Sequence, residues 1–230
     1  MTLFAPLNVA NIQSCSRAHR ATGQLYRLIG VVLAALTLPT QLRAADFVEG
    51  ISIAPVSREV FDRWEMQYDT AVLWSFGKDA TPLDYAFLPQ ILSVKTPQFT
   101  HFNTGGGDIV VRARLSLLAE PIVVGPESYY VGFSFSPSIE WWNKPRSLAA
   151  FFSVGGGVGL MDAQGYKVAG GQGQDFTLNW FATAGLKYRW NDHWSAGLGI
   201  MFQHLSNGGQ DPVNPGVNAV GPTLGLSWHF

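Results

Sequence analysis

Charged residues, cysteines and long apolar runs are all scarce in this 230-residue sequence. Charged residues make up only 13% of the chain, against about 25% in ordinary soluble domains. The single cysteine, Cys15, lies near the N-terminus, so the rest of the chain has no disulfide and no cysteine-based metal site. After Ala45 no apolar run reaches the ~18 residues of a membrane-spanning helix. These absences argue against an ordinary soluble domain, a disulfide scaffold and a helical membrane protein.

A basic surface for nucleic acid is also missing. Residues 1–44 hold four arginines and no acidic residue, so residues 45–230 carry eleven basic and sixteen acidic side chains, a net charge of −5. Domains that bind nucleic acid usually show a clustered positive excess. We therefore expect no nucleic-acid partner.

The N-terminal segment predicts an export signal. Three arginines within residues 17–27 precede an apolar run at 28–38, which is too short to cross a bilayer as a helix. A small residue, Ala44, follows. This order is typical of a secretory signal peptide, so we predict a leader at 1–44 and an exported part at 45–230. A buried core helix is the alternative interpretation of the apolar run.

The exported part is rich in the residues of a lipid-facing β-protein. Aromatic residues make up 13% of the chain, with eight tryptophans, and there are 25 glycines. Segments of alternating hydrophobicity recur between turn residues, which is typical of transmembrane β-barrels. We predict an all-β fold, an eight-stranded antiparallel transmembrane β-barrel of the outer membrane. The predicted strands span residues 47–53, 68–77, 108–118, 128–142, 147–161, 175–190, 194–207 and 217–230.

The clearest alternation lies in the last two predicted strands. At 194–207 one face carries tryptophan, alanine, leucine, isoleucine and phenylalanine, while the other carries mainly serine and glycine. Side chains two residues apart share a face, so His204 and Ser206 continue the apolar row. In the strand at 217–230 the apolar row ends at Asn218. The sequence thus predicts that these three polar side chains gather on the outer surface of one hairpin.

Loop lengths indicate which end of the barrel faces which compartment. Residues 143–146 and 191–193 are short enough for tight turns, whereas 161–174 and 208–216 are longer. Outer-membrane barrels have short periplasmic turns and longer external loops, so we expect His204 at the external end. At about 3.4 Å per residue and a tilt near 40°, it lies roughly 26 Å above the start of its strand. That height is near the edge of an apolar band about 25 Å tall.

Two further groups follow from the alternation. Aromatic residues beside the tight turns should form a girdle at the periplasmic rim: Trp141, Tyr188, Trp190, Trp194 and Trp228. Charged residues on the inward rows should form an interior salt-bridge network: Arg112, Arg114, Glu140, Lys187 and Arg189.

Residues 78–106 do not fit this arrangement. They join two predicted strands on the periplasmic side, hold three prolines and are far too long for a turn. We predict a long irregular connection with a short helix over Tyr85–Leu92, unless the strand count is wrong there.

The expected geometry suggests chemistry. A loop centred near Pro212 predicts cross-strand pairs whose numbers sum to about 424, with Ser206 opposite Asn218 and His204 diagonal to it. A serine beside a histidine, with an amide near the histidine, has the layout of a nucleophile, a base and its orienting group. A lipid-facing position would make the substrate a lipid ester. A polar rim without catalysis is the other interpretation.

A family resemblance supports the hypothesis of a serine hydrolase. The segments that carry it are His204-Leu205-Ser206-Asn207-Gly208-Gly209, Asn214-Pro215-Gly216-Val217-Asn218 and the aromatic C-terminal strand. They resemble the PagL family of lipid A 3-O-deacylases, and the similarity extends from about Ser128 onward. The ending Ser227-Trp228-His229-Phe230 is similar to the C-terminal signature of bacterial outer-membrane barrels.

The resemblance implies a function and its setting. It implies an eight-stranded barrel, exported to the Gram-negative outer membrane, that hydrolyses the ester-linked 3-hydroxyacyl chain at position 3 of lipid A. The partners would be lipopolysaccharide and outer-membrane lipids. No cofactor is expected, because serine hydrolysis needs none.

The resemblance also implies roles for single residues. Ser206 would be the nucleophile and His204 the general base. Asn207 would shape the oxyanion hole together with the backbone N–H groups of Gly208 and Gly209.

The resemblance also extends to the loop after Ser206 and to the residue that orients the histidine. Asn214 matches an asparagine of the family's loop. The family's acidic residue matches Asn218, an amide that can orient a histidine but cannot stabilise its cation by charge. Asp211, the only acid in the loop, is the alternative third member.

Two other functions fit parts of the pattern. One is a non-catalytic eight-stranded barrel, structural or adhesin-like, that keeps the fold without the activity. The other is a soluble lipocalin-like barrel, which the outward rows of tryptophan, phenylalanine and leucine disfavour. The sequence leaves open whether the chain acts as a monomer or as a homodimer.

Overall fold

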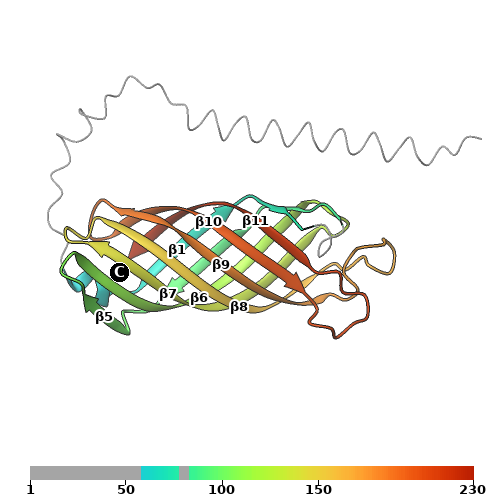
Figure 1. The fold of residues 1–230 in the computed structure, drawn as a ribbon, viewed down its shortest axis with the longest axis horizontal. Coiled ribbons are helices and arrows are strands. Elements are labelled where there is room, and N and C mark those ends of the chain that lie inside the picture. The colour runs from blue at the N-terminus through green and yellow to red at the C-terminus, as the bar shows by residue number, and fades with distance from the viewer. Residues whose placement is uncertain (1–57, 78–82) are drawn as a thin grey trace, which may run out of the picture. The chain divides into compact units, whose positions relative to one another are not determined.

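The computed structural model describes residues 58–77 and 83–230, which form a closed antiparallel β-barrel (Figure 1). The predicted signal peptide (1–44) and the predicted strand at 47–53 lie outside the described residues. None of the helices in the described ranges is long and apolar enough to cross a membrane. The elements in chain order are η1 (Arg58–Asp62), β1 (Glu65–Ala71), β2 (Leu73–Ser75), β3 (Ala86–Phe87), β4 (Gln90–Lys95), β5 (Thr100–Asn103), β6 (Gly107–Val124), β7 (Tyr129–Asn143), β8 (Leu148–Met161), β9 (Phe176–Arg189), β10 (Trp194–Ser206) and β11 (Val217–His229).

These strands build a wall of eight. β1 and β2 together form the first wall strand, β3 to β5 the second, and β6 to β11 the remaining six. The wall closes where β1 pairs with β11, from Glu65 opposite His229 to Ala71 opposite Thr223. A closed barrel has no free sheet edge, and the predicted all-β, eight-stranded antiparallel fold is confirmed.

The second wall strand corrects the sequence prediction. Residues 86–103, expected to lie in an irregular connection with a helix, instead form β3, β4 and β5 along β6. Pro89 and Pro97 fall at the two interruptions, and proline cannot donate a ladder hydrogen bond. Backbone bonds such as Thr96 N–H to Ala113 O (3.0 Å) hold the strand to β6 across one of them. Prolines thus cut one strand into pieces too short to show a clear alternation.

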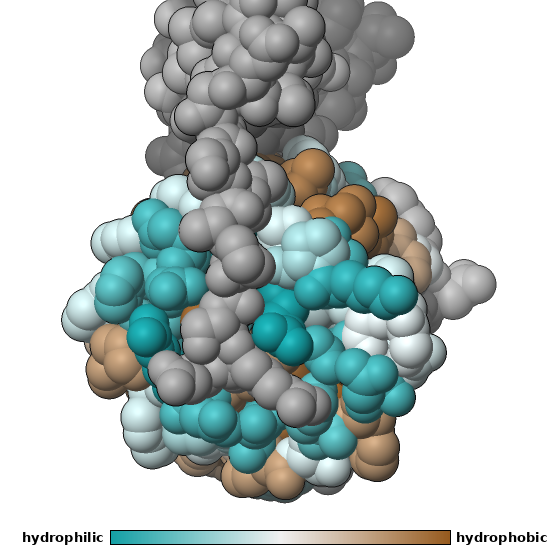
Figure 2. All heavy atoms as spheres, turned by 90° about the vertical axis from the view of Figure 1, so that its left-hand side faces the viewer, coloured by the Kyte–Doolittle hydropathy of each residue, from teal (hydrophilic) through white to brown (hydrophobic). Residues whose placement is uncertain are grey.

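The two ends of the barrel differ. The "turn end" carries the tight turns after β7 and β9 together with η1 and the C-terminus, and the "loop end" carries loops 162–175 and 207–216 (Figure 1). Viewed from the turn end, the described rim is largely hydrophilic while apolar side chains gather on the flanks (Figure 2). The five aromatic residues predicted as a girdle are all exposed and lie close to this end: Trp141, Tyr188, Trp190, Trp194 and Trp228.

The lumen is filled by buried polar and charged side chains. Lys187 Nζ lies 2.7 Å from Glu65 Oε1 and 3.1 Å from Glu140 Oε1, and Lys95 Nζ lies 2.8 Å from the same Glu140 oxygen. Arg114 pairs with Asp69 at 2.8 Å, nearer the middle of the barrel. These groups are almost fully buried, so each charge needs a partner to offset its lost hydration. The interior salt-bridge network predicted for Arg112, Arg114, Glu140 and Lys187 is confirmed.

Arg189 differs from that prediction. Within the described chain it makes no ion pair, and its guanidinium lies 4.1 Å from the ring centroid of Trp142 and 5.8 Å from that of Phe61. Phe61 comes from η1 and is fully buried inside the turn end. The cation therefore meets aromatic faces, an arrangement that residue charge alone does not predict.

Candidate active site

His204 and Ser206 point out of the barrel wall at the loop end of β10. Met201, Gln203 and Leu205 are buried in the lumen, whereas the even-numbered residues between and after them are half-buried on the outer face. This is the two-residue alternation of a strand whose two faces meet different surroundings. The predicted outward orientation of both side chains is confirmed.

The pairing of β10 with β11 is shifted from the predicted one. Cross-strand pairs run from Trp194 opposite Trp228 to Leu205 opposite Val217, so paired numbers sum to 422. His204, rather than Ser206, is therefore directly opposite Asn218. The prediction took Pro212 as the loop centre, and the ladder shows that the centre lies one residue earlier.

This register brings the histidine and the amide into contact. His204 Nδ1 and Asn218 Oδ1 lie 2.7 Å apart, a hydrogen-bond distance. An amide oxygen can only accept, so the hydrogen of this bond sits on Nδ1, which in the neutral ring defines one tautomer. The lone pair of that tautomer is on Nε2, where a general base needs it. Asn218 can thus orient His204 as a base without carrying a charge.

Ser206 lies one step farther along the same outward row. The Cα atoms of residues two apart on a strand are separated by roughly 7 Å. A histidine and a serine side chain together can span that distance. In residues 58–77 and 83–230 the Ser206 hydroxyl makes no hydrogen bond, to His204 or to any other group. Catalytic hydrogen bonds are often long without substrate, so the absence of this contact in the free protein is compatible with a serine–histidine pair.

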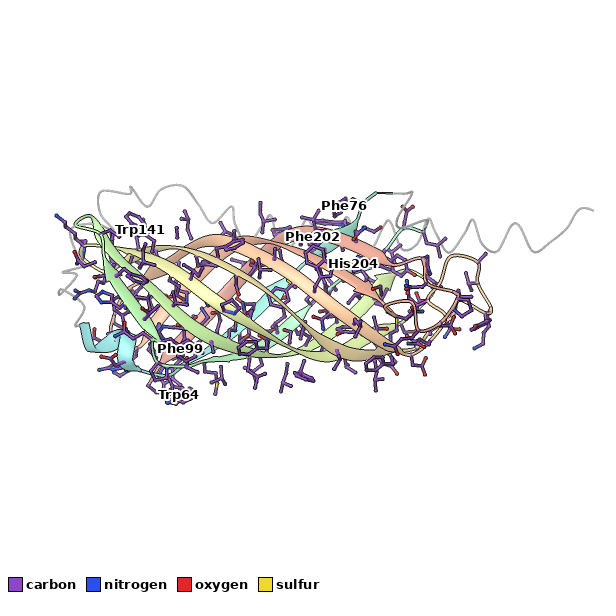
Figure 3. All side chains as sticks on the ribbon, turned by 60° about the horizontal axis from the view of Figure 1, so that its bottom comes forward. Trp64, Phe76, Phe99, Trp141, Phe202 and His204 are labelled. Carbon is purple, nitrogen blue, oxygen red and sulfur yellow. The ribbon has the colours of Figure 1, made fainter. Side chains whose placement is uncertain are left out.

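Aromatic rings surround the histidine on the wall. Trp180 on β9 is directly opposite His204, and their ring centroids are 5.9 Å apart. Trp180 also packs on Phe202 at 4.6 Å, and Phe202 on Phe76 at 5.7 Å. Figure 3 shows Phe76, Phe202 and His204 close together on the outer surface of the wall. The polar pair therefore sits at the edge of an apolar, aromatic patch.

Asn207 makes several hydrogen bonds within the loop that follows Ser206. Its buried amide donates to the carbonyl oxygens of Val213 (3.1 Å) and Asp211 (3.4 Å), and its Oδ1 accepts the Gly209 N–H (2.9 Å). Its backbone N–H donates to Asn214 Oδ1 at 3.0 Å. The side chains of Asn207 and Asn214 thus hold the loop that follows Ser206 in its conformation.

One backbone donor next to the serine is left over. Gly208 has a φ of +65°, a conformation that favours glycine. No hydrogen bond of the Gly208 N–H is found among the residues that the structure describes. Of the three donors predicted for an oxyanion hole, the backbone N–H of Gly208 is the one not already engaged within the loop.

Asp211 lies away from the histidine. Its carboxylate accepts the Tyr166 hydroxyl (2.9 Å) and the Val213 N–H (2.8 Å), which ties the loop at 162–175 to the loop at 207–216. The hydrogen bond to Asp211 raises the pKa of Tyr166 above its ordinary value. Asp211 is a loop-joining residue here, and the structure brings Asn218, not Asp211, to His204.

Sequence reasoning did not connect Trp180 and Tyr166 with the site. Hydrophobic alternation is enough to put Trp180 on the apolar row of its strand, but only the pairing of β9 with β10 shows that it faces His204. The partner of Tyr166 depends on the fold of two loops, for which hydrophobic alternation carries no signal.

A second serine–histidine pair lies inside the barrel. Ser195 Oγ and His229 Nε2 are 3.0 Å apart, and His229 Nδ1 lies 3.7 Å from Glu65 Oε2. All three residues are fully buried beside the charged cluster of the lumen. An ester group has no access to this serine, so the outward-facing pair is the better candidate for chemistry.

The fold and the candidate site together indicate the class of protein to which the chain belongs. The chain is an eight-stranded barrel with a serine, a histidine and an amide on the outer face of its last hairpin. The family model described as lipid A 3-O-deacylase (PagL) matches residues 93–227, more than half of the sequence. The chain belongs to this family.

Comparison with solved structures gives two similar chains. The crystal structure of the outer membrane enzyme PagL has a TM-score of 0.48 and 17% identity, covering 70% of this chain and 97% of that one. Neisserial surface protein A (NspA) has a TM-score of 0.43 and 10% identity, covering 73% and 97%. None of the curated proteins matches the sequence.

Proposed function

We propose that the protein is a lipid A 3-O-deacylase, a serine hydrolase that removes the ester-linked 3-hydroxyacyl chain of lipopolysaccharide. The observation that carries the proposal is the hydrogen bond between His204 Nδ1 and Asn218 Oδ1 on the outward face. It leaves the basic nitrogen of the ring available beside the Ser206 row. Membership of the lipid A 3-O-deacylase family supports lipid A as the substrate.

The first half of the reaction forms an acyl-enzyme. His204 Nε2 takes the proton of the Ser206 hydroxyl while Oγ attacks the ester carbonyl of the acyl chain. The negative charge on the carbonyl oxygen is stabilised by the Gly208 N–H. When the ester bond breaks, the imidazolium returns the proton to the departing sugar oxygen, which leaves as the 3-hydroxyl of lipid A.

The second half releases the fatty acid. His204 takes a proton from a water molecule, whose oxygen attacks the acyl-enzyme carbonyl. Collapse of this intermediate returns the proton to Ser206 Oγ and yields the free 3-hydroxy acid. Every proton is carried by His204, so the reaction needs no cofactor.

The proposed location is the outer membrane, with the loop end outside. The wall presents a belt of exposed apolar side chains on most of its strands, such as Phe133 and Phe135 on β7 and Leu198 and Ile200 on β10. An outward apolar band flanked by aromatic girdles is typical of outer-membrane barrels. Residues 1–44 would act as the export signal, and the outer leaflet would bring lipid A to the level of His204.

Mass spectrometry of lipid A tests the proposal. Cells that express the wild-type protein should lose one 3-hydroxyacyl chain from lipid A, and Ser206→Ala should leave lipid A intact. Ser195→Ala is the matched control, because it removes the buried hydroxyl of the other serine–histidine pair and should retain activity. Loss of activity in Ser195→Ala with full activity in Ser206→Ala would move the chemistry to the lumen and refute the proposal.

The amide at position 218 favours one alternative, a barrel that keeps the fold without catalysis. A neutral partner stabilises the histidine cation less than a carboxylate does. If the wild type leaves lipid A unchanged while Asn218→Asp creates activity, the chain is a non-catalytic barrel.

A further inference from the structure

Catalysis at this site would create a cation, and within residues 58–77 and 83–230 no carboxylate makes a hydrogen bond or ion pair with His204. In the proposed function, on which this inference rests, His204 becomes an imidazolium when it takes the Ser206 proton. In the described part of the chain, the side chains that contact the ring by hydrogen bond or ring packing are Asn218 and Trp180. Neither is charged. A transition state with developing charge is favoured by groups that are already oriented to stabilise that charge.

Trp180 is fixed against the histidine by the strand register. It stands directly opposite His204 on β9, as Asn218 does on β11, so the ring lies between the two. Its indole leans along the wall onto Phe202, and the next outward residue of its own strand is the small Ala182, which faces Phe202. A larger residue at 182 would occupy that space. The position of the indole therefore follows from the packing of the wall.

The distance suits an interaction between a cation and an aromatic ring. Such contacts are favourable within about 6 Å of the ring centroid, and tryptophan gives the strongest. The centroids of Trp180 and His204 are 5.9 Å apart with the planes tilted by 35°. The surroundings are the apolar side chains of Phe202 and Val220, and a poorly solvated setting strengthens the attraction.

We propose that the indole of Trp180 stabilises the imidazolium form of His204 during catalysis, a task that a carboxylate at position 218 would otherwise perform. Trp180 acts through His204 and is a positioning residue in the same sense as Asn218. Asn218 sets the tautomer from one side, and Trp180 supplies an electron-rich face from the other.

Fluorination of the indole tests the electrostatic part of the proposal. Fluorine withdraws electron density from the ring and weakens the cation–π contact with almost no change in shape. Growth on 5-fluorotryptophan labels all eight tryptophans, so Trp180→Phe grown the same way is the control. We expect the label to lower kcat about two-fold in the wild type, leave KM unchanged, and have no effect in Trp180→Phe. An equal effect in both proteins, or none in the wild type, would overturn the proposal.

A second measurement separates charge from packing. Trp180→Leu should lower kcat about three- to ten-fold when residue 218 is asparagine. In an Asn218→Asp background the loss should be smaller, because the carboxylate already neutralises the cation. Equal losses in both backgrounds would show that Trp180 only fills space. If Ser206-dependent hydrolysis is absent throughout, the proposed function fails together with this one; if it is present, the two tests judge Trp180 alone.

Discussion

The side chain of Asn218 sets the tautomer of His204 but brings no negative charge to the site. Its oxygen accepts the hydrogen of His204 Nδ1 at 2.7 Å, as a carboxylate oxygen would. The tautomer needed for a general base is therefore preserved. What changes is the charge: an amide contributes a dipole, whereas a carboxylate contributes a full negative charge close to the developing cation. We infer that orientation and charge stabilisation, often supplied by one residue, are divided here between two.

The first prediction concerns that charge. Asn218→Asp keeps the size of the side chain and adds an anion, so kcat for lipid A deacylation should rise about ten-fold or more. Asn218→Leu removes the hydrogen-bond acceptor and should lower kcat, because the ring is no longer held in one tautomer. Initial rates on purified lipopolysaccharide in detergent measure both. A faster Asn218→Leu enzyme would contradict the account of the tautomer.

At the scale of elements, hydrophobic alternation predicted which face of a strand each side chain occupies, but neither the pairing register nor the loop conformations. β10 and β11 alternate over their whole length, so the outward faces of His204, Ser206 and Asn218 were predictable. The register between them was missed by two residues, because loop length alone does not say where the ladder stops. β3 to β5 were missed because prolines divide them. The partners of Asn207 and Asp211 lie in loops whose conformation follows from hydrogen bonds, not from periodicity.

The second prediction concerns the pairing of β7 with β8. A Cβ on Gly157 would overlap the carbonyl oxygen of Phe133 on the neighbouring strand, whereas a Cβ on Gly197 would meet its nearest atom at an ordinary 3.6 Å. Both glycines lie on inward rows of their strands. Gly157→Ala should therefore destabilise the barrel by about 2 kcal/mol, and Gly197→Ala should be nearly neutral. Urea unfolding in detergent micelles, followed by tryptophan fluorescence, compares the two variants. Equal midpoints would show that the strands separate easily at Gly157.

At the scale of the whole molecule, the barrel has its polar and apolar sides reversed relative to a soluble protein. Carboxylates and ammonium groups are packed in the lumen, and phenylalanine, leucine and tryptophan cover the outside. Glu65, at the start of the first wall strand, meets Lys187 of the sixth. Such cross-lumen pairs join strands that are distant in sequence, so they stabilise the closed wall and no single hairpin.

The third prediction tests this charged core. Lys187→Met leaves Glu65 and Glu140 with one cation fewer in a buried setting, which should cost about 3–5 kcal/mol of stability. Lys144→Met, at an exposed position in the turn after β7, is the matched control and should cost little. The temperature at which the folded form loses its faster gel mobility measures both. A Lys187→Met barrel as heat-resistant as the wild type would show that Lys95 and Arg112 together balance both carboxylates.

The outward direction of Ser206 and His204 determines how a substrate would arrive. A site carved into the lumen or a loop cleft samples molecules from solution, in three dimensions. A site on the flank of a barrel meets only neighbours that drift within the same leaflet, and the quantity that governs its turnover is their number per unit area. If the proposed activity holds, the packing of the leaflet would then regulate turnover without any contact to the protein.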